Sequence, residues 1–320
     1  MPKTHKPRAG SLQFWPRKRA ARVLPGANWN AIDKKHKGLL GFIGYKVGMA
    51  RALVRDLTTD SMTKNKQIIL PLTIVECPSM KILSIRFYKH DKVAKDILCE
   101  DLDKELKHKI KVPKTMRKAS EILAELEPRL GEFSDIRLVV YSLARQTSIK
   151  KTPDIAEMGL GGSLGEKFNF AKEKIGKEIH INDFAAKGQI YDIHGVTKAQ
   201  GFTGPVKRFG IGLRQHKSEK GVRRPGSLGP WTPSRLTYRA PLAGQHGFFT
   251  RLKYNSKVVD VNNAEKLALE FKHYGKVKSN YIAIKGSVQG PVKRQILLTA
   301  ALRETKKTKK ENFDLIKIMK

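Results

Sequence analysis

Acidic side chains are scarce in this chain. Only 29 of its 320 residues are Asp or Glu, against 64 Lys or Arg, which gives a formal net charge of +35. A surface so poor in carboxylates attracts polyanions, so we expect a nucleic acid as the partner. The 40% share of hydrophobic residues over this length is enough to bury a substantial core, which excludes a wholly disordered chain.

Cysteines and long hydrophobic runs are also rare. The two cysteines, Cys77 and Cys99, are too few for a four-ligand zinc site, and such sparse use is typical of a reducing compartment. The longest apolar runs, 68–75 and 138–143, are far shorter than the roughly 18 residues that a membrane span needs. The first ten residues hold no apolar signal segment. We therefore expect a soluble, cytoplasmic protein without a membrane partner.

The positive charge is concentrated in two segments. Residues 1–37 carry ten Lys or Arg and one acid, Asp33, and residues 195–257 carry thirteen and one acid, Glu219. Gly and Pro interrupt both segments before a helical or strand period can develop. Ordering a residue costs about 1–2 kcal/mol of backbone entropy, which few apolar contacts offset here. We expect two long basic non-globular extensions that are loose in the free protein.

The other segments are predicted to be folded domains with ordinary charge balance. Residues 38–78 contain two β-rich runs separated by a turn, which predicts antiparallel strands. Residues 79–184 mix strand-like KILSIRFYK and DIRLVVYSL with helical pieces, which predicts an α/β insertion. Residues 185–194 are predicted to be a strand leading into the central extension, 195–257. Residues 258–320 are expected to contain two closing strands and a tail, whose lysine run is interpreted as a solvated surface.

Two stretches carry apolar residues at helical spacing, and we predict helical structure in both. The first set is Ala94, Leu98, Leu102 and Leu106, and the second is Ala264, Leu267, Ala268 and Phe271. The second stretch also has an Asn in the N-cap region and Gly275 after it. The Gly-rich stretch MGLGGSLGEK, 158–167, lacks the spacing of a phosphate-binding loop, so we interpret it as a structural turn before a helix.

Catalytic and metal chemistry have little support. The central segment offers Glu219 as its single carboxylate, whereas Mg²⁺ chemistry needs clustered carboxylates, and the nine histidines show no zinc-ligand spacing. We predict no catalytic residue, metal, cofactor or small-molecule substrate. The alternatives are a metal-free RNA-processing enzyme that uses His216 and His246 as base and acid, and a general nucleic-acid-binding protein.

All three tryptophans lie in the two basic segments. Beside Arg and Lys they can stack on unpaired bases, which suits RNA better than duplex DNA. Trp29 can equally pack beneath its own segment. Trp231 lies between two prolines in GPWTP with few neighbours to pack on, so it is the stronger candidate for an RNA contact.

Two long motifs carry a resemblance to a known family. HGVTKAQGFTGPVKRFGI, 194–211, and RRPGSLGPWTPSRLTYRAPLAGQHGFFTR, 223–251, strongly resemble the universal ribosomal protein three family of the large subunit. GSLQFWPRKRA, 10–20, is similar to the N-terminal extension of its archaeal and eukaryotic branch. INDFAAKGQIYDIHG and KGSVQGPVKR extend the resemblance across most of the chain, whose size is more typical of archaeal members.

The resemblance implies a fold and a function. The fold is mainly β with an α/β insertion, in which a six-stranded translation-protein-type β-barrel is built from 38–78, about 185–194 and 258–305. The function is that of a structural constituent of the large ribosomal subunit, with large-subunit rRNA and neighbouring large-subunit proteins as partners. Family members bind 23S rRNA directly, promote early assembly and extend the central segment toward the peptidyl transferase centre, with the residue matching Trp231 at its tip.

The resemblance also implies rRNA-contacting residues. Those on the matched motifs are Trp15, Arg17, Lys18, Arg19, Lys198, Lys207, Arg208, Arg223, Arg224, Trp231, Arg235, Gln245 and Arg251. Further basic and histidine side chains of the two extensions complete the predicted rRNA-binding set, namely Lys3, His5, Arg8, Arg214, His216 and Arg239. The family commonly has Gly-Lys-Gly where this chain has Ala199-Gln200-Gly201, so one cation of the family pattern is missing.

Overall fold

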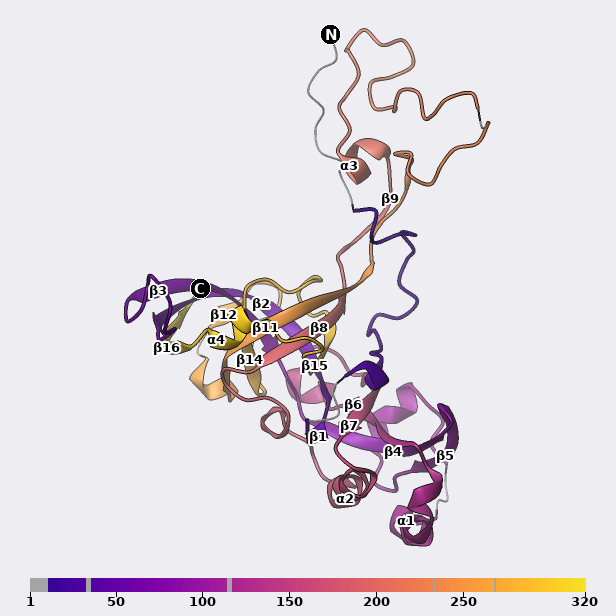
Figure 1. Ribbon diagram of the computed structural model, residues 1–320, viewed down its shortest axis with the longest axis vertical. Helices are drawn as coiled ribbons and strands as arrows, with labels where there is room; N and C mark the ends of the chain where they lie inside the picture. The colour runs from indigo at the N-terminus through magenta and orange to yellow at the C-terminus, as the bar shows by residue number, and fades with distance from the viewer. Residues whose placement is uncertain (1–10, 33–35, 114–116, 233, 268) are drawn as a thin grey trace. The chain divides into compact units, whose positions relative to one another are not determined.

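The computed structural model describes residues 11–32, 36–113, 117–232, 234–267 and 269–320 (Figure 1). The chain divides into two compact units. We call residues 1–22 with 196–250 the arm unit, and residues 23–195 with 251–320 the β unit. The predicted rRNA-binding residues Lys3, His5 and Arg8 lie outside the described residues.

Six antiparallel strands form a hydrogen-bonded ring. In ring order they are β15 (Gln295–Ala300), β8 (Ile190–Val196), β11 (Thr250–Asn262), β14 (Tyr281–Lys285), β3 (Gln67–Glu76) and β2 (Gly41–Asp56), and pairing of β15 with β2 closes the ring. A seventh strand, β16 (Phe313–Met319), pairs with the second half of β2. Register shifts interrupt the β2–β3 and β11–β14 ladders. The mainly β prediction is confirmed, and the structure has an irregular ring where a regular six-stranded barrel was expected.

The first half of β2 is buried on both faces. Its residues from Gly41 to Val47 are all buried, whereas the second half largely alternates between buried and more exposed positions. Gly41 leaves room for Trp29, because a Cβ on Gly41 would lie 2.6 Å from the Trp29 ring. Trp29 is only 5% exposed and belongs to the main hydrophobic core. Trp29 is therefore a core residue that packs against strands distant in sequence, so neither an RNA contact nor packing beneath its own segment describes it.

Four strands of the α/β insertion and the short strand β1, which precedes the insertion in sequence, form a five-stranded antiparallel sheet. Its order is β1 (Gly38–Leu39), β7 (Ile155–Gly161), β6 (Asp135–Ser142), β4 (Met80–Lys89) and β5 (Lys92–Leu98). Helices α1 (Ala119–Leu126) and α2 (Leu164–Lys174) contribute Leu123 and Phe168 to the core it shares with β2. The Gly-rich stretch begins as the end of β7, and a capping box between Ser163 and Glu166 begins α2 within it, so a short turn before a helix is present as predicted.

Both predicted helical stretches are largely wrong. Residues 92–98 form strand β5, because a tight turn with positive φ at His90 and Asp91 returns the chain along β4. In the second stretch the described residues form one short 3-10 helix, η6 (Ala264–Lys266), and the strand pair β12 (Glu270–Phe271) and β13 (Gly275–Lys276). Leu267 and Phe271 are buried against β2 and β3 residues there, so tertiary packing overrides the helical spacing.

The remaining elements are short. The other 3-10 helices are η1 (Trp29–Ala31), η2 (Lys104–His108), η3 (Glu127–Glu132), η4 (Ala144–Thr147) and η5 (Ile181–Asp183). The lysine run forms the single-turn helix α4 (Lys306–Lys310), whose lysines are exposed, in agreement with a solvated surface. Strand β16, which follows α4, has no counterpart among the sequence predictions.

The arm unit is more structured at its base than the sequence indicated. Strands β9 (Ala199–Thr203) and β10 (Gly244–Gly247) form an antiparallel pair, and α3 (Pro205–Phe209) follows β9. Between α3 and β10 the described residues form no helix or strand, and Figure 1 shows this stretch as a long open loop. The expectation of unpatterned chain throughout 195–257 is therefore wrong at both ends and correct in the middle.

Candidate nucleic-acid interface

The arm unit concentrates positive charge without carboxylates to neutralise it. Its 77 residues include seventeen Lys or Arg and a single acid, Glu219, which gives a formal charge of +16. The ion pairs between described residues lie within the β unit, for example Arg137 with Asp135 at 3.0 Å. The arm unit thus has the charge of a polyanion-binding surface, whereas the β unit carries more interleaved charge.

The predicted rRNA-binding residues divide into two groups by exposure. The exposed group can reach a ligand without rearrangement: Lys18, Arg19, Lys198, Lys207, Arg214, His216, Arg223, Arg224, Trp231, Arg235 and Arg239. The half-buried group is Trp15, Arg17, Arg208, Gln245 and Arg251. Arg251 belongs to the β unit, where its carbonyl accepts a hydrogen bond from Gln289.

Arg208 binds the returning chain of its own unit. Its Nε donates to the Gln245 carbonyl and its Nη1 to the Leu242 carbonyl, both at 2.9 Å. The guanidinium packs against Gly244, where a Cβ would approach it to 3.0 Å. Burial lowers the pKa of Arg208 from its ordinary value. Arg208 therefore fixes α3 to the segment that enters β10, in addition to supplying charge.

An aromatic cluster replaces an ordinary hydrophobic core in this unit. The Arg17 guanidinium lies 4.4 Å from the centroid of the Phe209 ring and 5.0 Å from that of Trp15. The Trp15 ring also contacts Tyr238 edge-on, with 5.5 Å between centroids. These residues come from the N-terminal segment, from α3 and from the open loop. Cation–π and ring contacts thus hold three distant parts of the chain together.

Backbone contacts join the N-terminal segment to the same unit. The Ala20 amide donates to the Phe248 carbonyl at 2.8 Å, and Arg19 lies 5.4 Å from the Phe248 ring centroid. The described parts of 1–22 and 196–250, which make up most of the two basic segments, therefore form one structural unit. Sequence reasoning placed Trp15 and Arg17 in the interface but missed Phe209 and Tyr238. The pairs Arg208-Phe209 and Tyr238-Arg239, in which a cation adjoins an aromatic residue, were the available signal.

His246 lies in a strongly cationic environment. Burial and the nearby charges of Lys207, Arg17 and Arg208 lower its pKa below the ordinary value of 6.5. Its Nδ1 is buried without a hydrogen-bond partner among the described residues, as are Nε1 of Trp15 and Oγ1 of Thr203. Protonation of the imidazole is therefore unfavourable until an anion approaches.

The end of β10 depends on glycine at one position. Gly247 has a φ of +72°, and a Cβ there would lie 2.0 Å from the Lys198 carbonyl oxygen. This close approach lets the Phe248 amide donate to the same carbonyl at 3.0 Å. Gln245 donates from Nε2 to the Gly247 carbonyl at 2.9 Å, so part of its amide is used within β10.

Trp231 is the most exposed large hydrophobic residue of the arm unit. It is 92% exposed, and a compact turn holds its backbone, with the Ser234 amide and hydroxyl donating to the Trp231 carbonyl at 2.7 and 3.0 Å. Phe202, Leu213 and Leu236 are also exposed. Exposed aromatic rings beside Arg and Lys provide stacking surfaces for unpaired bases.

Two chemical alternatives find no assembled site in the described part of the chain. His216 lies in the open loop and His246 on β10, and no hydrogen bond between their side chains is present among the described residues. No three His, Cys, Asp or Glu side chains of the described residues come together to hold a metal ion. No helix within the described ranges is long and apolar enough to cross a membrane.

Comparison with known proteins finds a match along the whole chain. The family model described as Ribosomal protein L3 matches residues 1–318. The large ribosomal subunit protein uL3 of Methanobrevibacter smithii is 38% identical over 96% of this chain and 95% of its own length. The proteins of the same name from Methanocaldococcus jannaschii and Archaeoglobus fulgidus are 37% and 35% identical over 93% and 99% of this chain, and over 92% and 97% of their own lengths.

Proposed function

Because the chain belongs to the ribosomal protein L3 family, a non-enzymatic family of large-subunit structural proteins, we propose that it binds 23S rRNA directly through its arm unit. Membership makes the chain a component of the large ribosomal subunit in translation, with rRNA and ribosomal proteins as neighbours. The prediction that it is not an enzyme is confirmed, and the RNA-processing alternative is set aside.

The observation that carries the proposal is the uncompensated charge of the arm unit. Seventeen Lys or Arg face one acid there. Each RNA phosphate that pairs with an exposed cation releases counterions, which favours binding. The phosphates of an enclosing RNA also reduce the repulsion between these cationic side chains. Carboxylates that could compete with RNA phosphates for the same cations are nearly absent from the unit.

The structure supports a division of labour among the predicted contact residues. One group of these residues makes contacts within the arm unit that hold β9, α3 and β10 in place. It consists of Arg208, Gln245 and the cluster around Arg17. The exposed set, with Arg223, Arg224 and Arg235 among its members, is available for phosphates. Trp231 is available to stack on a base or ribose. For Lys3, His5 and Arg8 the proposal rests on the family resemblance alone.

The finer family properties belong to the same proposal. We propose that the open loop reaches toward the peptidyl transferase centre with Trp231 at its tip, and that binding occurs early in subunit assembly. We also propose that the six-strand ring is an irregular form of the family's translation-protein-type β-barrel. The antiparallel order and the closing β15–β2 ladder support that assignment.

The proposal is tested by measuring which nucleic acid the full chain prefers as salt is raised. Archaeal 23S rRNA, an unrelated structured RNA of similar length and duplex DNA are compared in filter binding at several salt concentrations. A shaped rRNA site keeps its preference for 23S rRNA when nonspecific phosphate binding has collapsed. Equal loss of all three complexes would instead indicate a general nucleic-acid-binding protein.

A further inference from the structure

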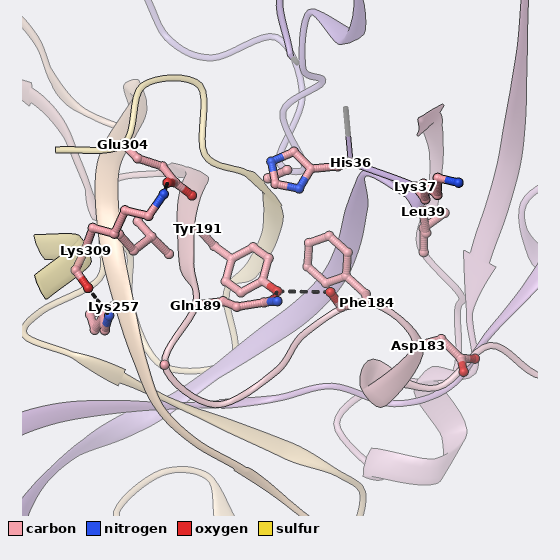
Figure 2. Close-up of a pocket in the computed structure, with 13 residues that line it drawn as sticks. His36, Lys37, Leu39, Asp183, Phe184, Gln189, Tyr191, Lys257, Glu304 and Lys309 are labelled. Atoms are coloured by element: carbon pink, nitrogen blue, oxygen red, sulfur yellow. Dashed lines mark hydrogen bonds and ion pairs between the residues drawn. The ribbon is translucent and has the colours of Figure 1, made fainter. Parts of the chain in front are cut away.

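A pocket of about 300 Å³ lies within the β unit (Figure 2). It is formed by the chain entering β1, the segment between η5 and β8, Lys257 of β11, and the residues that follow β15. Its volume is at the lower end of the range for small-molecule and cofactor pockets. None of the predicted rRNA-binding residues lines it.

One wall of the pocket is aromatic. Phe184 and Tyr191 lie side by side with 4.8 Å between ring centroids, and the Tyr191 hydroxyl donates to the Phe184 carbonyl at 3.0 Å (Figure 2). The single proton of the Tyr191 hydroxyl is shared between this carbonyl and Oε1 of Gln189, which also accepts from the Ala186 amide. Its Nε2 has no protein partner among the described residues. A fixed aromatic wall therefore stands beside an amide that can donate to a ligand.

Lys257 brings an incompletely paired charge to the pocket. The residue is only 5% exposed, and among the described residues its Nζ makes one long hydrogen bond, 3.4 Å, to the Lys309 carbonyl. An ammonium group has three donors, and a buried cation is stable only when it is well paired. The carboxylates of Glu304 and Glu311 lie close enough to favour its charged form, although burial lowers its pKa overall.

The other charges of the pocket are already engaged. Of the described residues that line the pocket, Glu304 pairs with Lys309 at 3.3 Å, Asp183 pairs with Lys174, and Lys37 pairs with Glu166. Glu311 does not line the pocket and pairs with Lys285 at 2.8 Å. Lys257 and the exposed imidazole of His36 can therefore bind an anion. Figure 2 shows His36 above the aromatic pair.

From this arrangement we infer that the pocket receives one nucleotide, with its base against Phe184 and Tyr191 and its phosphate toward Lys257 and His36. An acidic peptide would satisfy Lys257 but would leave the aromatic wall and the Gln189 amide unused. RNA-binding proteins commonly accept a single splayed-out base on an aromatic side chain and bond its edge. In the ribosome the bound nucleotide would belong to rRNA, and this part of the inference rests on the proposed function. A free nucleotide offers the pocket the same chemistry.

In the first test, the full chain is titrated with each of the four nucleoside 5′-monophosphates, and binding is measured by saturation-transfer NMR. We expect saturable binding that weakens at least fivefold in Lys257→Met and in His36→Ala. Lys253→Met is the matched control, because Lys253 is a half-buried lysine of the same strand outside the pocket. It should change the affinity less than twofold. The exposed His36 variant keeps the test valid if Lys257→Met fails to fold.

The second test irradiates the complex of the full chain with 23S rRNA and maps cross-linked peptides by mass spectrometry. Cross-links within 183–191 support the inference. If rRNA binds but neither cross-links in this segment nor saturable nucleotide binding is found, the pocket inference is overturned and the proposed function stands. If nucleotides bind the pocket while rRNA does not bind the chain, the pocket inference stands and the proposed function fails.

Discussion

The hydroxyl of Tyr45 donates a 2.7 Å hydrogen bond to Oδ2 of Asp154. Tyr45 lies on ring strand β2, and Asp154 precedes β7 of the α/β insertion, so this bond joins the two parts of the β unit. Ser142 lies 2.7 Å from the same hydroxyl, and Lys150 pairs with Asp154. Burial and the Asp154 charge raise the pKa of Tyr45 well above its ordinary value.

Removing this hydroxyl should weaken the attachment of the insertion to the ring. Tyr45 is fully buried, so Tyr45→Phe leaves the Asp154 oxygen without one of its donors. We expect the free energy of unfolding to fall by about 1–3 kcal/mol, measured by urea denaturation. Tyr254→Phe, at a half-exposed residue of β11, is the control and should cost little. Equal costs for the two variants would contradict this account.

Gly247→Ala should loosen the base of the arm unit. The substitution places a Cβ at positive φ and against the Lys198 carbonyl, so the Phe248 amide loses its acceptor geometry. We expect hydrogen exchange of that amide to accelerate about tenfold, which corresponds to about 1.4 kcal/mol. Gly229→Ala, where a Cβ would meet nothing within 4 Å, should leave this amide unchanged. Unaltered protection in Gly247→Ala would refute the role assigned to this glycine.

His246 should couple RNA binding to pH. Its pKa in the free protein is lowered by burial and by Lys207, Arg17 and Arg208. RNA phosphates beside those cations should raise the pKa, so the complex takes up a proton and affinity increases as pH falls below about 6.5. We expect His246→Gln to reduce the slope of log affinity against pH between about 5.5 and 7. The same slope in both proteins would show that His246 does not titrate on binding.

Trp231→Ala should leave incorporation of the protein into the large subunit intact but impair translation by that subunit. The side chain is 92% exposed, so its loss removes little packing within the chain. Ribosomes carrying the variant should assemble in near-normal amount but handle aminoacyl-tRNA or translation factors abnormally. Subunit profiles and misincorporation assays measure the two effects. Normal translation and fidelity would contradict a functional position for Trp231.

Strand periodicity made much of the β unit predictable from sequence. The runs that became β2, β3, β4, β6, β14 and β15 have apolar patterns bounded by turn residues, and they were identified. Strand β5 was mistaken for helix because the spacing of Ala94 and Leu98 fits either structure. The deciding feature is the turn at His90 and Asp91, whose positive φ values cannot be read from apolar spacing.

Contacts between distant segments could not be predicted from local patterns. Charge and tryptophan content identified the arm unit as the candidate interface. No periodicity in the sequence predicts that Arg17 contacts the rings of both Trp15 and Phe209, because residues about 190 positions apart share no local pattern. For the same reason, local patterns do not predict that Trp29 packs against Gly41 of β2 and Gly159 of β7.

The salt dependence of 23S rRNA binding tests the central assignment of affinity to the arm unit. Arg223, Arg224 and Arg235 are replaced together by Gln in one variant, and the exposed Lys92, Lys95 and Lys107 of the β unit in another. We expect the arginine variant to flatten the slope of log affinity against log salt by about 2 units, and the lysine variant to keep the slope of the unmodified protein. Equal slopes for the two variants would contradict this assignment.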